Sequence, residues 1–242
     1  MRIAVLSDIH SNLAALDAVL GSLGTVDAVW HLGDLVGYGP EPDGVVERLR
    51  AVGAIGVKGN HDDAACGGES IERFTPDARA AAEWTRSHMS EETRAYLIGL
   101  PERLEPQRWD FTLVHGSPRE PLFEYLDTAP AARDNLAALT TAYCFVGHTH
   151  VPLIIREEHS LMRARPVERE SRVGLDERRA FLNPGSVGQP RDGDPTASYL
   201  LIDTEATAVT WQRVAYNIKT TQAAVLAAGL PPRLARRLGS GL

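Results

Sequence analysis

The chain has 242 residues, of which 43% are hydrophobic and 24% are charged, as expected for a globular protein with one substantial core. Its formal net charge of −7 argues against non-specific binding to nucleic acid or to an anionic membrane. The same charge does not exclude a phosphate-bearing substrate, because bound metal cations would provide positive charge where the phosphate lies.

Neither the cysteines nor the N-terminal residues indicate export. Cys66 and Cys144 lie outside any CxxC pattern, and two cysteines are too few for a disulfide framework. The apolar run over residues 3–6 is shorter than the hydrophobic region of a signal peptide, and no run reaches the roughly 20 apolar residues of a membrane span. We therefore expect a cytoplasmic protein that does not associate with membranes.

The first part of the chain alternates between strand and helix patterns. Short apolar runs, typical of buried strands, alternate with stretches that carry apolar side chains at helical spacing. Asn12 is a candidate N-cap for the first helix, and the glycines and prolines over residues 37–42 mark a loop. A mainly parallel sheet is favoured by the predicted order of strand, helix, strand, helix and strand over residues 3–6, 13–20, 27–32, 45–52 and 54–57.

The middle of the chain is more helical. Residues 70–100 are predicted to be a helical insertion, with helices over 78–84 and 91–97 that separate near Ser90. Two further strands and the helix between them are predicted over residues 111–114, 143–146 and 131–139, respectively.

The pattern changes after His150, where strands follow one another with turn residues between them. We expect mostly antiparallel pairing among strands over residues 151–156, 180–182, 198–202 and 208–213. Residues 157–179 carry many charges of both signs and are predicted to be an exposed loop or hairpin. A last helix over residues 222–228 is expected to end before Pro231-Pro232, with a basic tail after it.

Polar residues follow five of the predicted strands at the point where each strand ends. These motifs are Ser7-Asp8-Ile9-His10, Gly33-Asp34, Gly59-Asn60-His61-Asp62, Val114-His115-Gly116 and Gly147-His148-Thr149-His150. Ligands of open α/β sheets bind at the carboxyl ends of the strands. If the five strands are mostly parallel, the motifs meet at one edge and form one site.

The residue types in these motifs suit divalent metal ions. Carboxylate, amide oxygen and neutral imidazole are ligands for Mn²⁺, Fe or Zn²⁺ rather than for Cu(I) or an iron–sulfur cluster. Five of the eight histidines lie in the motifs. The other three, His31, His88 and His159, are interpreted as structural or surface residues.

All five motifs, in this order and without substitution, resemble the pattern D-x-H, G-D, G-N-H-D/E, H and G-H-x-H of the calcineurin-like metallophosphoesterase superfamily. Residues 33–40 and 183–188 are similar to the small bacterial and archaeal branch of that superfamily. The resemblance implies an α/β fold of the metallo-dependent phosphatase type, a four-layer α/β/β/α sandwich with two mixed β-sheets. It would cover residues 1–242 as one domain.

The resemblance also implies a dinuclear metal centre. Asp8, His10 and His150 would bind the first ion, and the second would be bound by Asn60, His115 and His148. Asp34 would bridge the two ions. Mn²⁺ is the expected metal, with Fe, Zn²⁺, Ni²⁺ and Mg²⁺ as alternatives, because this set of ligands accepts several ions.

These ligands imply metal-dependent hydrolysis of a phosphoester bond. A hydroxide that bridges two cations would attack the phosphorus of a phosphodiester or phosphomonoester. By the resemblance, His61 faces the substrate and either protonates the leaving group or stabilises the transition state. Asp62 is expected either to orient His61 or only to occupy the N-terminus of a helix, where an acidic residue is favoured.

Three other residues are candidates for substrate binding. Asn12 could donate a hydrogen bond to a phosphate oxygen, or it could only cap a helix. Arg191 could bind a phosphate bidentately, or it could form a surface salt bridge. Tyr38 could line the substrate pocket, or its loop could simply pack there.

Two other functions fit parts of the sequence. A non-catalytic metal-binding scaffold on the same fold would be expected to have lost ligands, whereas the motifs here are intact. A nuclease would need a basic groove, which the net charge of −7 disfavours. We therefore predict a small phosphoester as substrate and no stable binding of nucleic acid. The sequence pattern determines neither the oligomeric state nor whether the substrate is a monoester or a diester.

Overall fold

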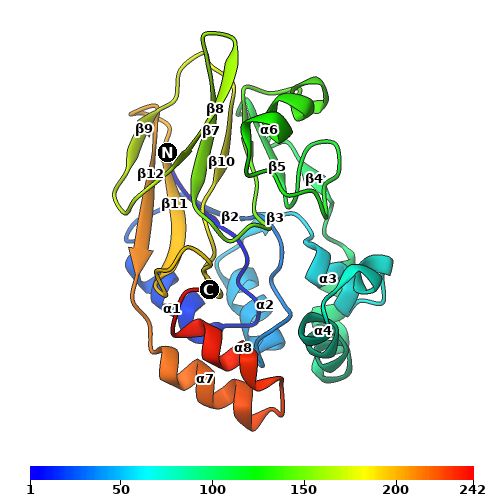
Figure 1. The fold of residues 1–242 in the computed structure, drawn as a ribbon. Coiled ribbons are helices and arrows are strands. Elements are labelled where there is room, and N and C mark those ends of the chain that lie inside the picture. The colour runs from blue at the N-terminus through cyan, green and yellow to red at the C-terminus, as the bar shows by residue number, and fades with distance from the viewer.

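Two six-stranded β-sheets pack face to face at the centre of the molecule (Figure 1). The computed structural model describes residues 1–242. In order across the first sheet, the strands are β3 (Ile55–Gly56), β2 (Ala28–His31), β1 (Arg2–Leu6), β11 (Ala197–Asp203), β12 (Ala208–Val214) and β9 (Arg172–Gly174). Those of the second are β4 (Arg103–Leu104), β5 (Phe111–Val114), β6 (Tyr143–Phe145), β10 (Ala180–Asn183), β7 (Leu153–Glu158) and β8 (Leu161–Pro166).

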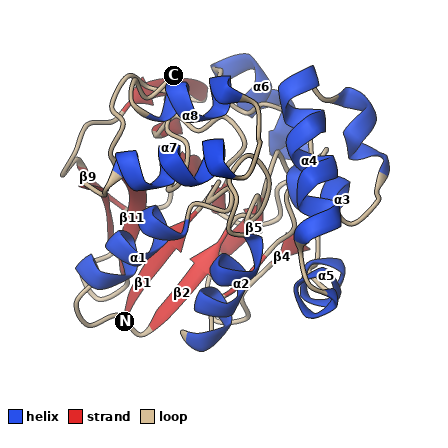
Figure 2. Cartoon of the chain, turned by 90° about the horizontal axis from the view of Figure 1, so that it is seen from below, coloured by secondary structure: helices blue, strands red, loops and turns tan.

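Helices cover the outer face of each sheet. The first sheet packs against α1 (Leu13–Ser22), α2 (Pro42–Ala51) and α5 (Glu91–Ile98), and Figure 2 shows α1 and α2 lying over β1 and β2. The second sheet packs against α6 (Ala129–Asn135) and the 3₁₀ turn Leu136–Ala138 that follows it. This arrangement confirms the expected four-layer α/β/β/α sandwich.

The remaining helices are α3 (Asn60–Ala65), the 3₁₀ turn Glu69–Arg73, α4 (Pro76–His88), α7 (Ile218–Ala227) and α8 (Pro232–Leu238). One small apolar cluster joins α4, α7 and α8 and includes part of Tyr38. The helices expected within residues 70–100 are thus present as α4 and α5. No helix of the chain is both long enough and apolar enough to cross a membrane.

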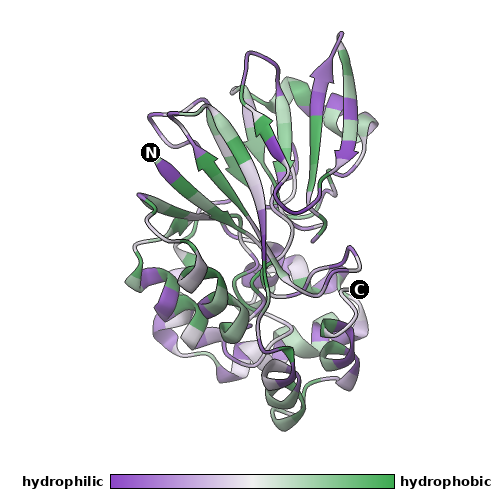
Figure 3. Cartoon of the chain, turned by 90° about the vertical axis from the view of Figure 1, so that its left-hand side faces the viewer, coloured by the Kyte–Doolittle hydropathy of each residue, from purple (hydrophilic) through white to green (hydrophobic).

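Strand β1 shows why a continuous apolar run predicts a buried strand. Ile3 and Val5 point into the core between the two sheets, whereas Ala4 and Leu6 point toward the helices on the outer face. Both faces of the strand are therefore apolar. In Figure 3 hydrophobic residues predominate along the strands of both sheets.

The expected antiparallel pairing among the strands after His150 is confirmed, because β7 pairs with β10 and β11 pairs with β12, but parallel and antiparallel strands are not separated between the two sheets. Strands β1, β2 and β3 are parallel neighbours in one sheet, but β5 and β6 are parallel neighbours in the other. Late strands then complete both sheets, because β11 pairs antiparallel with β1 and β10 pairs parallel with β6. Both sheets are consequently mixed, as the family resemblance implied.

Two local expectations concern the later part of the chain. The charged region over residues 157–179 contributes to a hairpin, one of the two forms expected: β7 and β8 form a hairpin that projects at the top of Figure 1, and β9 pairs with β12. The basic tail expected after Pro231 is instead the helix α8, which begins at Pro232. Proline is favoured at the first position of a helix because that residue needs no amide hydrogen bond and its φ already fits the helix.

The core between the sheets should dominate the stability of the fold. We predict that Phe145→Ala lowers the free energy of unfolding by about 3–5 kcal/mol, because Phe145 is fully buried there and its removal leaves a cavity. The matched control is Ile98→Ala on α5, where Ile98 is 56% exposed and the change should stay within about 0.5 kcal/mol. Urea unfolding of both variants measures this, and equal losses would contradict the assignment of the core.

Candidate metal centre

The five motifs meet at one end of the sandwich although their strands belong to two sheets. The loops after β1 and β2 and the start of α3 come from the first sheet, and those after β5 and β6 come from the second. The structure brings together and buries all eight residues expected at the centre: Asp8, His10, Asp34, Asn60, His61, His115, His148 and His150.

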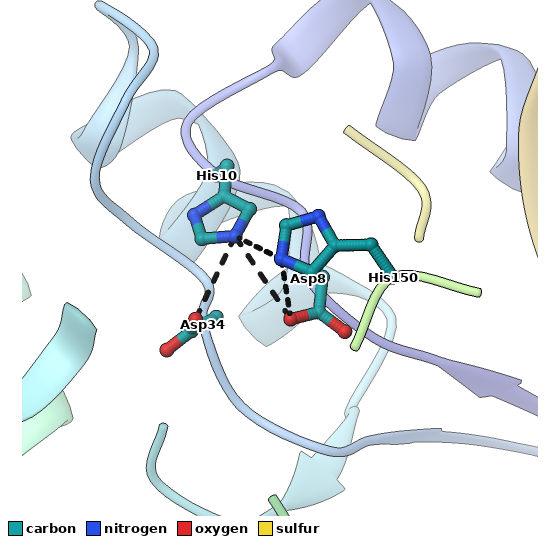
Figure 4. Close-up of side chains that lie close together, drawn as sticks. All are labelled: Asp8, His10, Asp34 and His150. Atoms are coloured by element: carbon teal, nitrogen blue, oxygen red, sulfur yellow. Dashed lines mark hydrogen bonds and ion pairs between the residues drawn. The ribbon is translucent and has the colours of Figure 1, made fainter. Parts of the chain in front are cut away.

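One group of metal-ligating atoms comes from Asp8, His10, Asp34 and His150 (Figure 4). The Nε2 atoms of His10 and His150 lie 3.2 Å apart, and His150 Nε2 is 3.2 Å from Asp8 Oδ1. His10 Nε2 also lies 3.6 Å from Asp34 Oδ2. These four residues are the three expected for the first ion together with the expected bridging residue.

The second group contains Asp34, His115 and His148, with Asn60 beside them. His115 Nε2 is 3.4 Å from Asp34 Oδ2, 3.1 Å from His148 Nδ1 and 2.9 Å from Asn60 Oδ1. Asp34 belongs to both groups, and its Oδ2 atom faces both His10 and His115. That position is the one a bridging carboxylate would take.

Hydrogen bonds behind the rings aim their other nitrogens into the centre. The Nδ1 atoms of His10, His115 and His150 lie 3.1, 2.8 and 2.6 Å from the backbone oxygens of Val36, Leu32 and Gln189, respectively. When its ring is neutral, each of the three histidines therefore donates through Nδ1 and presents Nε2 as an acceptor. Acceptors face one another across the centre, and the buried Asp8 Oδ1 has no hydrogen-bond partner. Cations fit this arrangement, because they would satisfy all of these atoms.

The charged groups at the centre also favour bound cations. Burial is the largest single influence on His115 and lowers its pKa, but the Asp34 and Asp8 carboxylates and the Leu32 carbonyl together raise the pKa of His115 to about 9. Positive charge is thus favoured beside Asp34. Burial lowers the pKa of His148 to about 3 and that of His10 well below its ordinary value, so these rings are neutral, the form that binds metal.

The backbone of the motifs is unusual. Asp8, His10, Asp34, His148 and His150 all have positive φ, between 52° and 65°. Such conformations cost about 1–3 kcal/mol each and persist where the surrounding structure holds them. Here the hydrogen bonds from Asp8 N to Gly33 O (3.1 Å) and from His10 N to Asp34 O (3.0 Å) tie the first two strand ends together. Asp and His tolerate this region better than most residues.

Comparison with known proteins agrees with this geometry. Residues 1–207 match the family described as the calcineurin-like phosphoesterase superfamily domain. The chain belongs to this superfamily. It is therefore a phosphoesterase, a hydrolase that acts on phosphoric esters, as its motifs predicted.

Three relatives of this phosphoesterase extend over most of its length. The crystal structure of a metallophosphoesterase from Sphaerobacter thermophilus is 46% identical, with a TM-score of 0.91 and coverage of 100% of this chain and 99% of that one. The protein MJ0912 of Methanocaldococcus jannaschii is 37% identical over 99% of this chain and 98% of its own. Phosphodiesterase YfcE of Escherichia coli is 28% identical over 86% of this chain and 91% of its own.

A cavity of about 310 Å³ opens onto the centre of the phosphoesterase. His61, Tyr38 and Arg191 line it together with Asp34, Asn60, His148 and His150. Sequence reasoning did not assign six further lining residues to the site, namely Arg73, Phe74, Thr75, Ala78, Phe123 and Tyr125. They lie in a 3₁₀ turn, at the start of α4 and in loops, where no periodic pattern marks a side chain as part of a site. The only available signal was the position of Phe123 and Tyr125 in the loop after the His115-Gly116 motif.

Of the two roles expected for Asp62, the contact with His61 does not form, and the position at the N-terminus of a helix is the one observed. Asp62 Oδ1 accepts hydrogen bonds from the backbone N–H groups of Leu35 (2.9 Å) and Val36 (3.1 Å), and Oδ2 accepts one from Gly59 (3.0 Å). No hydrogen bond joins it to His61, whose Nδ1 atom is buried without a partner. Asp62 instead caps the start of α3 and fixes the loop after Asp34.

Asn12 has the contacts of a helix cap rather than of a phosphate ligand. Its Oδ1 atom accepts hydrogen bonds from Ala15 N (3.2 Å) and Thr221 Oγ1 (2.9 Å). Its Nδ2 atom donates to Gly188 O (2.9 Å) and Tyr216 Oη (3.2 Å). The side chain is buried, all of its hydrogen-bonding groups have protein partners, and it does not line the cavity at the metal centre. Of the two roles expected for Asn12, these contacts fit the helix cap.

Gly59 holds the position of Asp34. A Cβ atom at residue 59 would overlap both the carboxylate and the backbone nitrogen of Asp34. We predict that Gly59→Ala displaces this carboxylate and weakens Mn²⁺ binding about 10–100-fold, the usual effect of disturbing groups that position metal ligands. Isothermal titration calorimetry measures the affinity, and circular dichroism checks that the variant folds.

The matched control for this prediction is Gly21→Ala in α1, where an added Cβ meets nothing within 4 Å. That substitution should leave Mn²⁺ binding unchanged and raise stability by about 0.5–1 kcal/mol, because alanine is the better helix former. A folded Gly59→Ala variant with wild-type affinity for Mn²⁺ would contradict the role given to Asp34.

Proposed function

We propose that this phosphoesterase hydrolyses small phosphodiesters at two divalent cations. The first ion would be held by Asp8, His10 and His150, and the second by Asn60, His115 and His148. Asp34 would bind both ions. The observation that carries the proposal is the convergence of acceptor atoms on two sides of Asp34 Oδ2. The activity named for the relative YfcE, a phosphodiesterase, supports the choice of diesters.

Mn²⁺ is the ion that we propose, because imidazole, carboxylate and amide oxygen together suit it; Fe, Zn²⁺, Ni²⁺ and Mg²⁺ are the alternatives. Two bound cations would supply the Lewis acidity that activates water and offsets charge on the phosphoryl oxygens. The two free cysteines, Cys66 and Cys144, agree with a cytoplasmic location, which we also propose.

His61 would deliver a proton to the leaving oxygen. Its ring lies against Tyr38, Phe74 and His10, with ring centroids 4.3, 4.4 and 4.9 Å away, so its position is fixed by packing. The ring lines the cavity, while its Nδ1 atom is buried beside Gly37 without a hydrogen-bond partner. Nε2 is therefore the nitrogen left for a ligand, and proton transfer by a positioned imidazole contributes about 10²–10⁴-fold to a rate.

Arg191 and Tyr38 would position the phosphate. The Nη2 atom of Arg191 donates a hydrogen bond to Gln189 Oε1 (3.0 Å), and no carboxylate lies within salt-bridge distance of its guanidinium. Its Nε atom is buried without a partner, and the guanidinium lies 5.9 Å from the centroid of the Tyr38 ring. A guanidinium that faces a cavity without a carboxylate partner is suited to bind a phosphate oxygen.

The variant His61→Ala tests the proposed proton donor. We predict that it lowers kcat for bis-p-nitrophenyl phosphate by about 10²–10⁴-fold and still binds both ions, because His61 is not among the proposed metal ligands. The matched control is His88→Ala, since His88 is an exposed histidine on α4 that stacks on Trp84 away from the cavity. Normal turnover by His61→Ala would disprove the assignment.

Removal of metal tests the proposed centre. A chelator should abolish hydrolysis and lower Tm, and added Mn²⁺ should restore both, because an ion that binds only the folded chain at 100 times its Kd stabilises it by about 2.7 kcal/mol. The variant Asn60→Ala should need much higher Mn²⁺ for the same recovery. Hydrolysis that survives complete removal of metal, verified by elemental analysis, would refute the proposal.

A further inference from the structure

A second cavity, of about 350 Å³, begins beside the metal centre. Tyr125 lines both this cavity and the one that opens onto the centre. The walls of the second cavity include Val151, Pro152, Ala164 and Pro166, and we call it the side groove. Its volume lies in the range of pockets that bind small ligands.

The side groove starts at the loop that carries two of the proposed metal ligands. Thr149, between His148 and His150, lines the groove, and Val151 and Pro152 follow directly. Hydrogen bonds from Val151 N (3.2 Å) and Asn183 Nδ2 (3.0 Å) to Thr149 Oγ1 fix this loop. A ligand whose phosphate lies at the centre can therefore extend into the groove along a rigid wall.

Tyr125 gives the groove an aromatic surface next to the centre. One face of its ring is stacked on His148, with centroids 4.2 Å apart and planes at 19°. The residue is nevertheless 51% exposed, so most of the remaining ring surface is available to a ligand. A half-exposed aromatic ring above apolar walls is suited to stack on a planar ring.

The polar groups of the groove restrict the ligand further. Asp127 lines the groove and forms no salt bridge, whereas Arg165 is engaged by Glu158 at 2.8 Å. An unpaired carboxylate repels a second phosphate and accepts hydrogen bonds from hydroxyl or amino groups. The groove thus fits a planar ring that carries hydroxyl groups and no further negative charge, which is the chemistry of a nucleoside.

The position of His61 indicates whether the nucleoside in the side groove is the group that leaves the phosphate or the group that stays on it. The His61 ring lies against His10, in the first group of proposed ligands, whereas Tyr125 lies against His148, in the second. We propose that the side groove binds the nucleoside of a nucleoside phosphodiester and that this nucleoside stays on the phosphate. The inference rests on the proposed function, because it takes His61 as the donor to the leaving oxygen.

The reaction that follows is balanced. The oxygen of water forms a new bond to phosphorus, and the bond from phosphorus to the other alcohol breaks. The leaving oxygen takes up a proton from His61, and water supplies the proton that restores the imidazole. The products are a nucleoside monophosphate, held in the side groove, and a free alcohol.

The test compares two diesters with the same leaving group. Thymidine 5′-(p-nitrophenyl) phosphate and methyl p-nitrophenyl phosphate both release p-nitrophenol, so they differ only in the retained group. We expect KM to be about 10-fold lower for the thymidine ester, within the range that stacking of one base on an aromatic side chain provides. Equal KM values would overturn the proposal.

A pair of variants locates the effect. Ala164→Trp places a large side chain in the side groove from the exposed strand β8 and should bring the ratio of the two KM values close to 1. Leu161→Trp lies on the same strand, 55% exposed and outside the groove, and should keep the wild-type ratio. A ratio that Ala164→Trp leaves unchanged would overturn the placement of the nucleoside.

A binding measurement separates this inference from the proposed function. With Mn²⁺ present, calorimetry compares thymidine 5′-monophosphate with methyl phosphate on the wild type, on Ala164→Trp and on Leu161→Trp. If the wild type and Leu161→Trp bind the nucleotide more tightly than methyl phosphate and Ala164→Trp does not, the side groove binds the nucleoside. That result would hold even if neither diester were hydrolysed, and in that case only the proposed function would fail. Equal binding of both ligands by the wild type would overturn the groove assignment whether or not hydrolysis occurs.

Discussion

The carboxylate of Asp34 is the group on which the centre depends. Its Oδ1 atom accepts the backbone N–H of His61 at 2.8 Å, and its Oδ2 atom lies within 3.6 Å of both His10 and His115. Burial alone would raise the pKa of this carboxyl, but His115 and His61 hold it well below its ordinary range. A buried charge is stable only with such partners, and removal of one partner costs about 3–5 kcal/mol.

The fold supplies those partners from two sheets. His10 and Asp34 follow neighbouring parallel strands of the first sheet, while His115 and His148 follow neighbouring parallel strands of the second. The packed core between the sheets holds the two strand ends at a fixed separation. The backbone is left-handed at Asp8, His10, Asp34, His148 and His150. The carbonyls of Leu32, Val36 and Gln189 orient three of the rings.

Local signals explain what the sequence could predict. Each motif directly follows a short apolar run, so β1, β2, β5 and β6 and the residues at their ends could be identified from neighbours in the chain. The pairing of β11 with β1 joins residues about 200 positions apart, and no local pattern encodes it. The hydrogen bonds of Asp62 to Leu35 and Val36, and the position of Tyr125 against His148, depend on such long-range packing and could not be predicted.

Chemistry and specificity are assigned to different parts of the chain. The motifs at the strand ends would hold the ions and the proton donor, whereas the loops and the β7–β8 hairpin shape the space for the rest of the substrate. The most direct test of the central claim is anomalous scattering from crystals soaked in Mn²⁺. We expect two peaks about 3.5–4 Å apart on either side of the Asp34 carboxylate. A single peak, or two peaks that do not share Asp34, would contradict it.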